Sequence, residues 1–334
     1  MKVLYAIQGT GNGHLSRARD VIPVLHKNKV DLDILVSGTQ ADIKIPYPVK
    51  YQLNGWSFIF GKKGGVDMWR TYAKTNSLRL QKEIKSIPVS DYDLVINDFE
   101  PVSAWACKQK NKECISLSHQ AAVLSPKAPE PKKNDRLGKF ILRKYAPTTK
   151  QYGLHFKNYD ENIFTPIIRQ DIRNITRTIG SHYTVYLPSY SDEKILNFLS
   201  KIKNVEWEVF SKHTENDFFW RNIAIRRINN ESFIKSMAAS KGVLCGAGFE
   251  TPAEALHMGK KLMVIPMKSQ YEQQCNAAAL NEMGVPVIKS LKTKHLDKVK
   301  NWVESNKKID VYYPNITESI IDRLLQEVVI GQTY

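Results

Sequence analysis

The chain of 334 residues is long enough for two domains of ordinary size, and its 42% hydrophobic and 10% aromatic residues are typical of a globular protein. No run approaches the roughly 20 apolar residues of a membrane-spanning helix, and the first residues predict a strand rather than a signal peptide, so we expect a cytoplasmic protein. The four cysteines lack metal-type spacing, which indicates reduced packing residues.

The net charge of +16 is distributed unevenly along the chain. Residues 1–177 hold 29 Lys and Arg against 16 Asp and Glu, a balance of +13, whereas residues 178–334 hold 20 against 17, a balance of +3. A basic first half is typical of a protein that meets an anionic membrane surface, an anionic acceptor or a nucleic acid. A general abundance of lysine is the alternative explanation, and it needs no partner.

Buried-strand patterns alternate with helical patterns along the chain, which predicts parallel α/β layers. In the first half, strands are predicted over residues 3–8, 33–36, 94–97 and 114–117, and helices over 15–27, 67–86 and 102–109. In the second half, strands are predicted over residues 184–187, 206–210, 223–226, 242–245, 262–265 and 286–288, with helices between them. The pattern predicts two doubly wound domains. We place their boundary within residues 164–180 and divide the chain into 1–170 and 171–334.

The first predicted strand runs into the sequence GTGNGH at residues 9–14 and then into a helix. Gly11 and Gly13 permit a tight turn and the close approach of a ligand to the backbone. As a dinucleotide signal the turn is weak, because no acidic residue closes the second strand at the spacing of a ribose contact. His14 lies at the carboxyl edge of the sheet, where such sheets bind ligands, and imidazole suits a catalytic base. A histidine that only caps its own helix is the alternative.

Two further strands also end in polar residues. Asp98 follows the strand over 94–97, where it either orients His14 or caps the next helix, and together with Glu100 it superficially suggests a metal-binding pair. His119 and Gln120 close the strand over 114–117, which makes His119 a second candidate for the base.

The basic first half contains two segments that join apolar and basic residues. Residues 58–65 read FIFGKKGG and predict a loop, and residues 138–145 read GKFILRKY and predict a short helix within a Pro- and Lys-rich excursion over 126–147. Both suit docking at an anionic bilayer, where apolar groups enter and Lys or Arg stay at the headgroups. An ordinary core helix and a solvated loop are the alternatives.

Residues 246–280 form the most specific stretch of the second half. The strand over 242–245 runs into a turn with Gly246 and Gly248, and a helix is predicted to begin with Thr251 as its N-cap and Pro252 at its first position. Backbone N–H groups at such a helix start attract phosphate.

A strand over 261–266 follows, then a polar turn with Glu272 and Gln273, and then a helix with Asn276. We therefore expect a phosphate, a ribose diol and a sugar to bind in one row along this half of the chain.

These motifs resemble the nucleotide-sugar signature of GT-B glycosyltransferases, and above all that of the UDP-N-acetylglucosamine transferase family of peptidoglycan synthesis and its family 1-like bacterial relatives. The resemblance implies two Rossmann-like domains that face each other across a cleft. It implies that Glu254 chelates the donor ribose, and that Glu272 and Gln273, with Asn276, bind the sugar. The turn at 9–14 resembles the family's Gly-Gly-Thr-Gly-Gly-His loop, which implies a place for Asn12 beside the acceptor and for His14 as base or phosphate contact.

The resemblance also implies roles for residues with weaker patterns. Arg169 resembles a hinge arginine near the diphosphate, although a surface arginine is the alternative. Gln120 stands where the acceptor-lining stretch usually has Glu. The family has a glycine turn after the first strand of its second domain, and this chain lacks those glycines there; Ser189 lies at that place and can still donate a hydrogen bond to a phosphate. Phe233 matches the apolar residue that the family has beside the nucleobase. A last helix near residues 317–328 is expected to pack back on the first domain.

Three functions remain as hypotheses. The first is an inverting glycosyltransferase with a nucleotide-sugar as substrate, no cofactor and no metal, since enzymes of this fold stabilise the leaving diphosphate with helix dipoles and basic groups; its acceptor is lipid-linked or anionic. The second is a UDP-N-acetylglucosamine 2-epimerase, which needs no acceptor. The third is a basic nucleic-acid-binding protein, which the lack of aromatics interleaved with basic residues disfavours.

Overall fold

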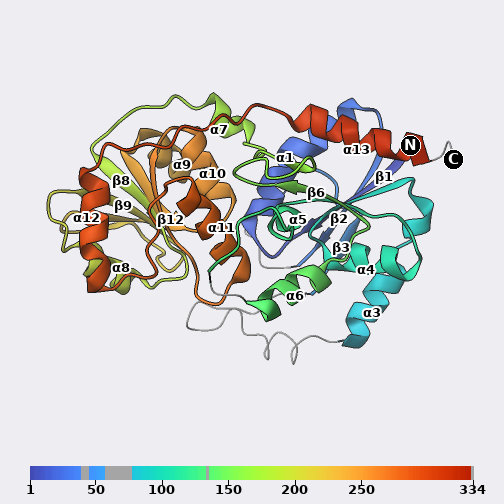
Figure 1. Cartoon of the computed structure of the whole chain (residues 1–334), viewed down its shortest axis with the longest axis horizontal. Helices are drawn as coiled ribbons and strands as arrows, with labels where there is room; N and C mark the ends of the chain where they lie inside the picture. The colour runs from blue at the N-terminus through green and yellow to red at the C-terminus, as the bar shows by residue number, and fades with distance from the viewer. Residues whose placement is uncertain (39–44, 57–76, 133–134, 332–334) are drawn as a thin grey trace.

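The computed structural model describes residues 1–38, 45–56, 77–132 and 135–331 (Figure 1). These residues form two α/β domains, each built on a largely parallel sheet packed with helices. The first domain fills the right of Figure 1 and the second the left. The prediction of two Rossmann-like domains is therefore confirmed.

The first sheet has seven strands in the order β3-β2-β1-β4-β5-β6-β7, and every neighbouring pair is parallel. Their bounds are β1 (Lys2–Gln8), β2 (Asp31–Ser37), β3 (Tyr51–Leu53), β4 (Leu94–Asp98), β5 (Ile115–Ser118), β6 (Lys150–Leu154) and β7 (Ile163–Phe164). Strands β1 and β4 are almost entirely buried, as expected for strands with helices on both sides. Their carboxyl ends form one edge of the sheet.

The second sheet has six strands in the order β10-β11-β9-β8-β12-β13, and only the β10–β11 pair is antiparallel. Their bounds are β8 (His182–Tyr186), β9 (Glu206–Ser211), β10 (Phe218–Trp220), β11 (Ile223–Arg227), β12 (Gly242–Gly246) and β13 (Lys261–Ile265).

The helices follow the strands in the expected alternation. Those of the first half are α1 (Asn12–Lys27), α3 (Ser77–Ser86), α4 (Pro101–Gln109), α5 (His119–Val123), α6 (Arg136–Tyr145) and α7 (Gln170–Asn174). Those of the second half are α8 (Asp192–Leu199), α9 (Asn230–Ala239), α10 (Glu250–His257), α11 (Tyr271–Glu282), α12 (Leu296–Glu304) and α13 (Thr317–Gly331).

Several predicted elements differ from the observed ones. Helix α1 begins three residues earlier than predicted, and residues 67–76 of the helix predicted over 67–86 lie outside the described residues. The strand predicted over 286–288 is a single bridge between Val264 and Val287. Strands β3, β6, β7 and β10 were missed because three of them have only two or three residues and β6 begins with two exposed polar residues.

The start of α10 corrects a more important prediction. Thr251 is not the N-cap, because the chain is already helical at Phe249 (φ −91°, ψ −53°) and Glu250 is the first helical residue. A local preference for Thr-Pro at a helix start was outweighed by Glu250, whose negative charge suits the helix N-terminus and whose carboxylate pairs with the other domain.

The two domains touch extensively. Phe249 of α10 packs on Phe156 of the first domain, with ring centroids 5.3 Å apart. Helix α13 returns to the first domain, where it lies over α1 in Figure 1 and where Glu318 pairs with Lys27 at 2.7 Å. Within the described residues, no helix is both long and apolar enough to cross a bilayer.

Candidate active site

Two cavities lie between the domains, and the first of them lies at the carboxyl ends of β1, β4 and β5. Cavity 1, of about 260 Å³, is bordered by residues of both domains, among them Gln8, His14, Phe99, His119, Gln120, Phe249 and Glu272. Cavity 2, of about 320 Å³, is bordered by Asn12, Arg169, Tyr186, Phe233, Thr251 and Glu254. Gly13 and Glu250 border both cavities, so the two adjoin there. This edge is where open α/β sheets bind their ligands.

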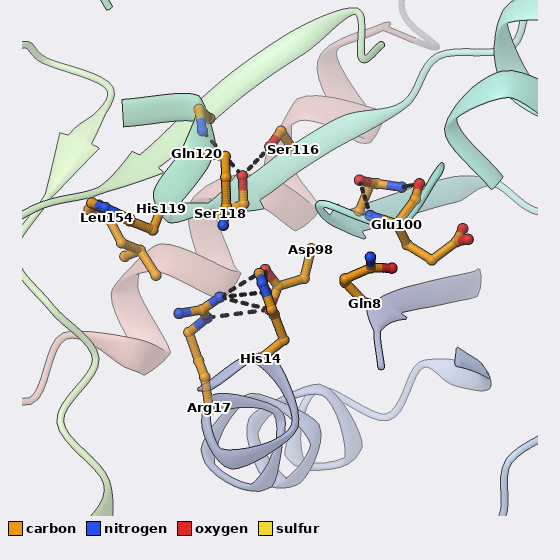
Figure 2. Close-up of polar contacts among 12 residues, drawn as sticks. Gln8, His14, Arg17, Asp98, Glu100, Ser116, Ser118, His119, Gln120 and Leu154 are labelled. Atoms are coloured by element: carbon orange, nitrogen blue, oxygen red, sulfur yellow. Dashed lines mark hydrogen bonds and ion pairs between the residues drawn. The ribbon is translucent and has the colours of Figure 1, made fainter. Parts of the chain in front are cut away.

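His14 lies in the first turn of α1, and its Nδ1 is 2.8 Å from Oδ1 of Asp98, the last residue of β4 (Figure 2). Because a carboxylate oxygen only accepts hydrogen bonds, this contact places the imidazole proton on Nδ1 and leaves the lone pair on Nε2. Nε2 has no hydrogen-bond partner among the described residues. The arrangement can serve as a general base that a carboxylate holds in position.

Arg17 holds Asp98 from the other side, and the sequence analysis missed it. Its Nη2 and Nε donate to the two carboxylate oxygens of Asp98 at 2.7 and 3.2 Å, and Nη2 lies 3.2 Å from Nδ1 of His14 (Figure 2). Burial opposes the ionisation of Asp98, but Arg17 and His14 outweigh it and lower the pKa of Asp98. The spacing of three residues from His14 was the available signal, because it puts both side chains on one helix face.

Of the two roles left open for Asp98, the contact with His14 is the one observed. The N-cap of α4 is Glu100, whose carboxylate accepts the backbone N–H groups of Val102 and Ser103 at 2.6 Å each and the hydroxyl of Ser37 at 2.5 Å. Within the described part of the chain, no group of three or more His, Cys, Asp or Glu is placed to hold a metal ion.

The structure contradicts the prediction that His119 is a second candidate for the base. The His119 Nδ1 is 2.7 Å from the Leu154 carbonyl oxygen (Figure 2). Its Nε2 is 2.6 Å from Oδ1 of Asn276, so neither nitrogen is left for a substrate. Its ring borders cavity 1 but is otherwise buried and stacks on Phe249, and burial lowers its pKa. The prediction for Asn276 is also wrong, because its side chain is buried between His119 and the Ala247 carbonyl. Both residues join the two domains.

Arg169 and Glu254, predicted to contact the diphosphate and the ribose separately, form a buried ion pair. Nε of Arg169 donates to Oε1 of Glu254 at 2.6 Å, and Nη1 donates to Asn230 at 3.1 Å. Oε2 of Glu254 has no hydrogen-bond partner among the described residues, and Glu254 borders cavity 2. A carboxylate that uses one oxygen on an arginine can still accept a ligand hydroxyl with the other.

Glu272 and Gln120 face each other across cavity 1, and Nε2 of Gln120 donates to Glu272 at 3.1 Å. Gln273, the neighbour of Glu272, does not reach the cavity. Its Oε1 instead accepts the backbone N–H of Met267 at 2.8 Å and fixes the turn before α11. The predicted sugar contact through Gln273 is therefore not supported by this arrangement, in which its Oε1 is used inside the protein.

The glycine turns differ in what they make room for. A side chain at Gly13 would come within 3.0 Å of Cγ of Glu250, so Gly13 accommodates Glu250 of the other domain. Apart from the adjacent residues in the chain, no atom of the described residues lies within 4 Å of a Cβ added at Gly11 or Gly248, and none lies closer than 3.9 Å to one added at Gly246. Their small size is not needed for packing, which leaves room for a ligand beside the backbone.

Three other predicted contacts can now be placed. Phe233 borders cavity 2 and packs on Tyr186, with ring centroids 5.3 Å apart. Asn12 was expected beside the acceptor but borders cavity 2, on the side of Arg169. Ser189 is exposed in the turn that follows β8 and borders neither cavity, so its predicted phosphate contact is not supported.

Three glutamines that border cavity 1 carry buried side-chain oxygen atoms with no hydrogen-bond partner among the described residues. They are the side-chain amide oxygens of Gln8, Gln120 and Gln270. Buried polar groups without partners are uncommon in proteins, and each is costly. A ligand with several hydroxyl groups would provide the missing donors.

The chain matches the model of glycosyl transferase family 1 over residues 1–305, and no curated protein matches it. Similar solved structures include MurG of Acinetobacter baumannii, with a TM-score of 0.58 and 15% identity over 98% of this chain and 100% of that chain. They also include Arabidopsis thaliana UGT89C1 complexed with UDP, with a TM-score of 0.60 and 13% identity over 97% and 94% of the two chains. Phytolacca americana UGT2, complexed with UDP-2fluoro-glucose and pterostilbene, has a TM-score of 0.58 and 13% identity over 98% and 94%.

At these identities the solved structures show the fold alone, and that fold is GT-B. The family model covers most of the chain, including both glycine turns and the His14–Asp98 contact. The chain therefore belongs to glycosyl transferase family 1, and it is a glycosyltransferase with the GT-B fold.

Proposed function

We propose that this glycosyltransferase moves a sugar from a UDP-sugar to an acceptor hydroxyl, with inversion at the anomeric carbon and without a metal ion. The observation that carries the proposal is the His14–Asp98 pair, in which Nδ1 lies 2.8 Å from the carboxylate while Nε2 remains unpartnered among the described residues at cavity 1. A base that activates the acceptor opposite the leaving group leads to inversion in one displacement.

In the proposed reaction, Nε2 of His14 takes the proton of the acceptor hydroxyl while the hydroxyl oxygen bonds to the anomeric carbon. The bond from that carbon to the diphosphate breaks, and its electron pair stays on the diphosphate. Asp98, ionised beside Arg17, stabilises the imidazolium that forms. The backbone N–H groups at the start of α10 stabilise the departing charge.

The two cavities suit the two halves of such a donor. In cavity 2, Phe233 and Tyr186 offer apolar surface for the nucleobase, and Oε2 of Glu254 can accept a hydrogen bond from a ribose hydroxyl. In cavity 1, Glu272 and the unpartnered amide oxygen of Gln120 can accept sugar hydroxyls. The presence of UDP in one similar structure and of UDP-2fluoro-glucose in another supports a UDP-sugar. Family membership favours a transferase over the epimerase and the nucleic-acid-binding hypotheses.

We further propose that helix α6 docks at an anionic bilayer and so brings cavity 1 to a lipid-linked acceptor. Leu137 and Phe140 are 65% and 58% exposed on this helix, next to the exposed Arg136, Arg143 and Lys144. Each basic group near such a surface contributes about 1 kcal/mol of reversible binding. The other segment predicted to dock, residues 58–65, lies outside the described residues.

Co-sedimentation with phosphatidylglycerol vesicles at low and high salt tests the docking proposal. We expect salt-sensitive binding that is lost when Arg143 and Lys144 are both changed to Glu. Charge reversal of Lys194 and Lys201, exposed residues in the second domain, is the matched control and should leave binding intact. Absence of binding at low salt would favour a soluble acceptor instead.

A thermal-shift screen across UDP-, GDP- and dTDP-sugars tests the donor. Ligands that bind only the folded state raise the unfolding temperature by mass action, so UDP-sugars should give the largest shift. A shift with GDP- or dTDP-sugars alone would refute uracil as the nucleobase of the donor. No shift with any of these sugars would refute the proposed donor site. With a transferable donor and an acceptor, NMR of the product should show the inverted anomer.

A further inference from the structure

Glu250 occupies the junction between the two cavities. It is the first residue of α10, it borders both cavities, and Gly13 leaves the space that its side chain fills. A nucleotide-sugar that spans the cavities would have to place its diphosphate, with two negative charges, at this junction. A carboxylate therefore stands where the diphosphate of the proposed donor has to pass.

The partner of Glu250 is a cation that the diphosphate also needs. Nη1 of Arg17 donates to the Glu250 carboxylate across the domain gap, while Nε and Nη2 donate to Asp98. Arg17 is 2% exposed, so its charge is poorly screened by water and its interaction with an anion is strong. In this state Glu250 shares the guanidinium with Asp98 and lies at the positive end of α10.

On the basis of the proposed donor site, we propose that the donor diphosphate displaces the carboxylate of Glu250 from Arg17, and that Glu250 takes up a proton as it is displaced. Binding of the donor is then coupled to protonation of one residue. Glu250 acts as a positioning residue that occupies Nη1 of Arg17 until a diphosphate arrives.

The surroundings of Glu250 support proton uptake. Arg17 and His14 of α1 face it with positive charge or a hydrogen-bonding ring, while Asp98 of β4 and Glu254 of α10 face it as carboxylates. Burial, opposed by Arg17 and reinforced by Glu254, raises the pKa of Glu250 to about 7. When Arg17 turns to the diphosphate, Glu250 loses its cation and gains a dianionic neighbour, and both changes favour its neutral form.

The size of the effect follows from that pKa. If only the protonated form allows the donor to bind, the apparent Kd rises as the protonated fraction falls, by about tenfold between pH 6 and pH 8. In Glu250→Gln the amide is neutral at every pH and the coupling disappears. We therefore expect Glu250→Gln to bind the donor about tenfold more tightly than the wild type at pH 8 and about equally at pH 6.

Calorimetric titration with UDP-glucose, GDP-glucose and dTDP-glucose tests this at pH 6, 7 and 8, in buffers of different ionisation enthalpy. The diphosphates of these sugars keep their two charges across this range, so a proton that is taken up comes to the protein. The wild type should take up close to one proton per donor at pH 8, and Glu250→Gln should take up none. Glu193→Gln, an exposed first-turn glutamate of α8, is the matched control and should behave as the wild type.

The outcomes distinguish a failure of the proposed donor site from a failure of the proposed displacement. If none of the three sugars binds to either protein, the proposed donor site is wrong and the displacement falls with it. If a sugar binds without proton uptake, or with the same pH dependence in Glu250→Gln, the donor site stands and the displacement is refuted. A circular dichroism spectrum and an unfolding temperature for each variant establish that it is folded.

Discussion

Replacement of Asp98 by Asn tests the proposed catalytic base, because it removes the carboxylate that orients His14 and leaves His14 itself in place. Asp98 accepts from His14 at 2.8 Å and from Arg17 at 2.7 to 3.2 Å, and its side chain is fully buried. The amide keeps the shape but loses the charge, so His14 loses the group that fixes its tautomer and Arg17 keeps only Glu250. The general-base contribution at risk is roughly 100-fold to 10,000-fold in kcat.

The same substitution costs stability. Removal of one partner from a buried ion pair typically costs about 3–5 kcal/mol, and we expect the lower end because Glu250 still pairs with Arg17. The assay is the initial rate of UDP release at saturating donor and acceptor, together with the free energy of unfolding in urea. We expect kcat to fall at least about 100-fold, with a small change in donor affinity.

Glu100→Gln is the matched control, because Glu100 is also a fully buried carboxylate at the end of β4 but caps α4 and does not contact His14. It should lower stability by about 1 kcal/mol and leave kcat within a few-fold of the wild type. If Asp98→Asn folds and keeps kcat within threefold, as a rough threshold on the scale of general-base effects, the assignment of the pair is refuted.

Three further predictions follow from the remaining contacts. Glu254→Gln should weaken UDP binding by about 1.5–3 kcal/mol in calorimetry, because it removes a charged acceptor for the ribose, and an unchanged affinity in a folded variant would contradict the donor assignment. Transfer should persist in EDTA; if EDTA abolishes it and Mg²⁺ or Mn²⁺ restores it, the metal-independent mechanism is wrong. Burial raises the pKa of Glu250 to about 7, above that of an unfolded Glu, so the folded state binds more protons than the unfolded state between about pH 4.5 and 7. Stability from this residue should fall as pH rises through that window, and unfolding temperatures of Glu250→Gln measured against the wild type should show the variant gaining relative stability toward pH 8.

The sequence predicts the layers of this fold better than the contacts between them. Alternating buried strands and helices were enough to place His14 and Asp98 at the same edge, because the carboxyl ends of neighbouring parallel strands meet there. The Arg17–Glu250 contact joins residues 233 positions apart on different domains, and no local pattern reports such a pairing.

Sequence-based predictions that the structure does not support failed because contacts formed in the folded chain, two of them between the domains, decide where these side chains lie. Thr251 was interpreted from a local preference at helix starts, and His119 from its place at a strand end and from the family resemblance. A cross-domain ion pair at Glu250 and a cross-domain hydrogen bond to Asn276 decide their surroundings instead. The family resemblance implied a sugar contact for Gln273, but in the structure its Oε1 accepts the backbone N–H of Met267. Residue type fixed what each side chain can do, and the packing of two domains fixed which of those options is used.

The central claim is that His14 is the base, and the most direct measurement compares transfer with donor binding in His14→Ala. His26→Ala is the matched control, because His26 lies exposed in the last turn of the same helix. We predict that His14→Ala binds the donor with nearly normal affinity and loses transfer by about 100-fold or more, while His26→Ala keeps both. Transfer by folded His14→Ala at a rate close to the wild type would contradict the claim.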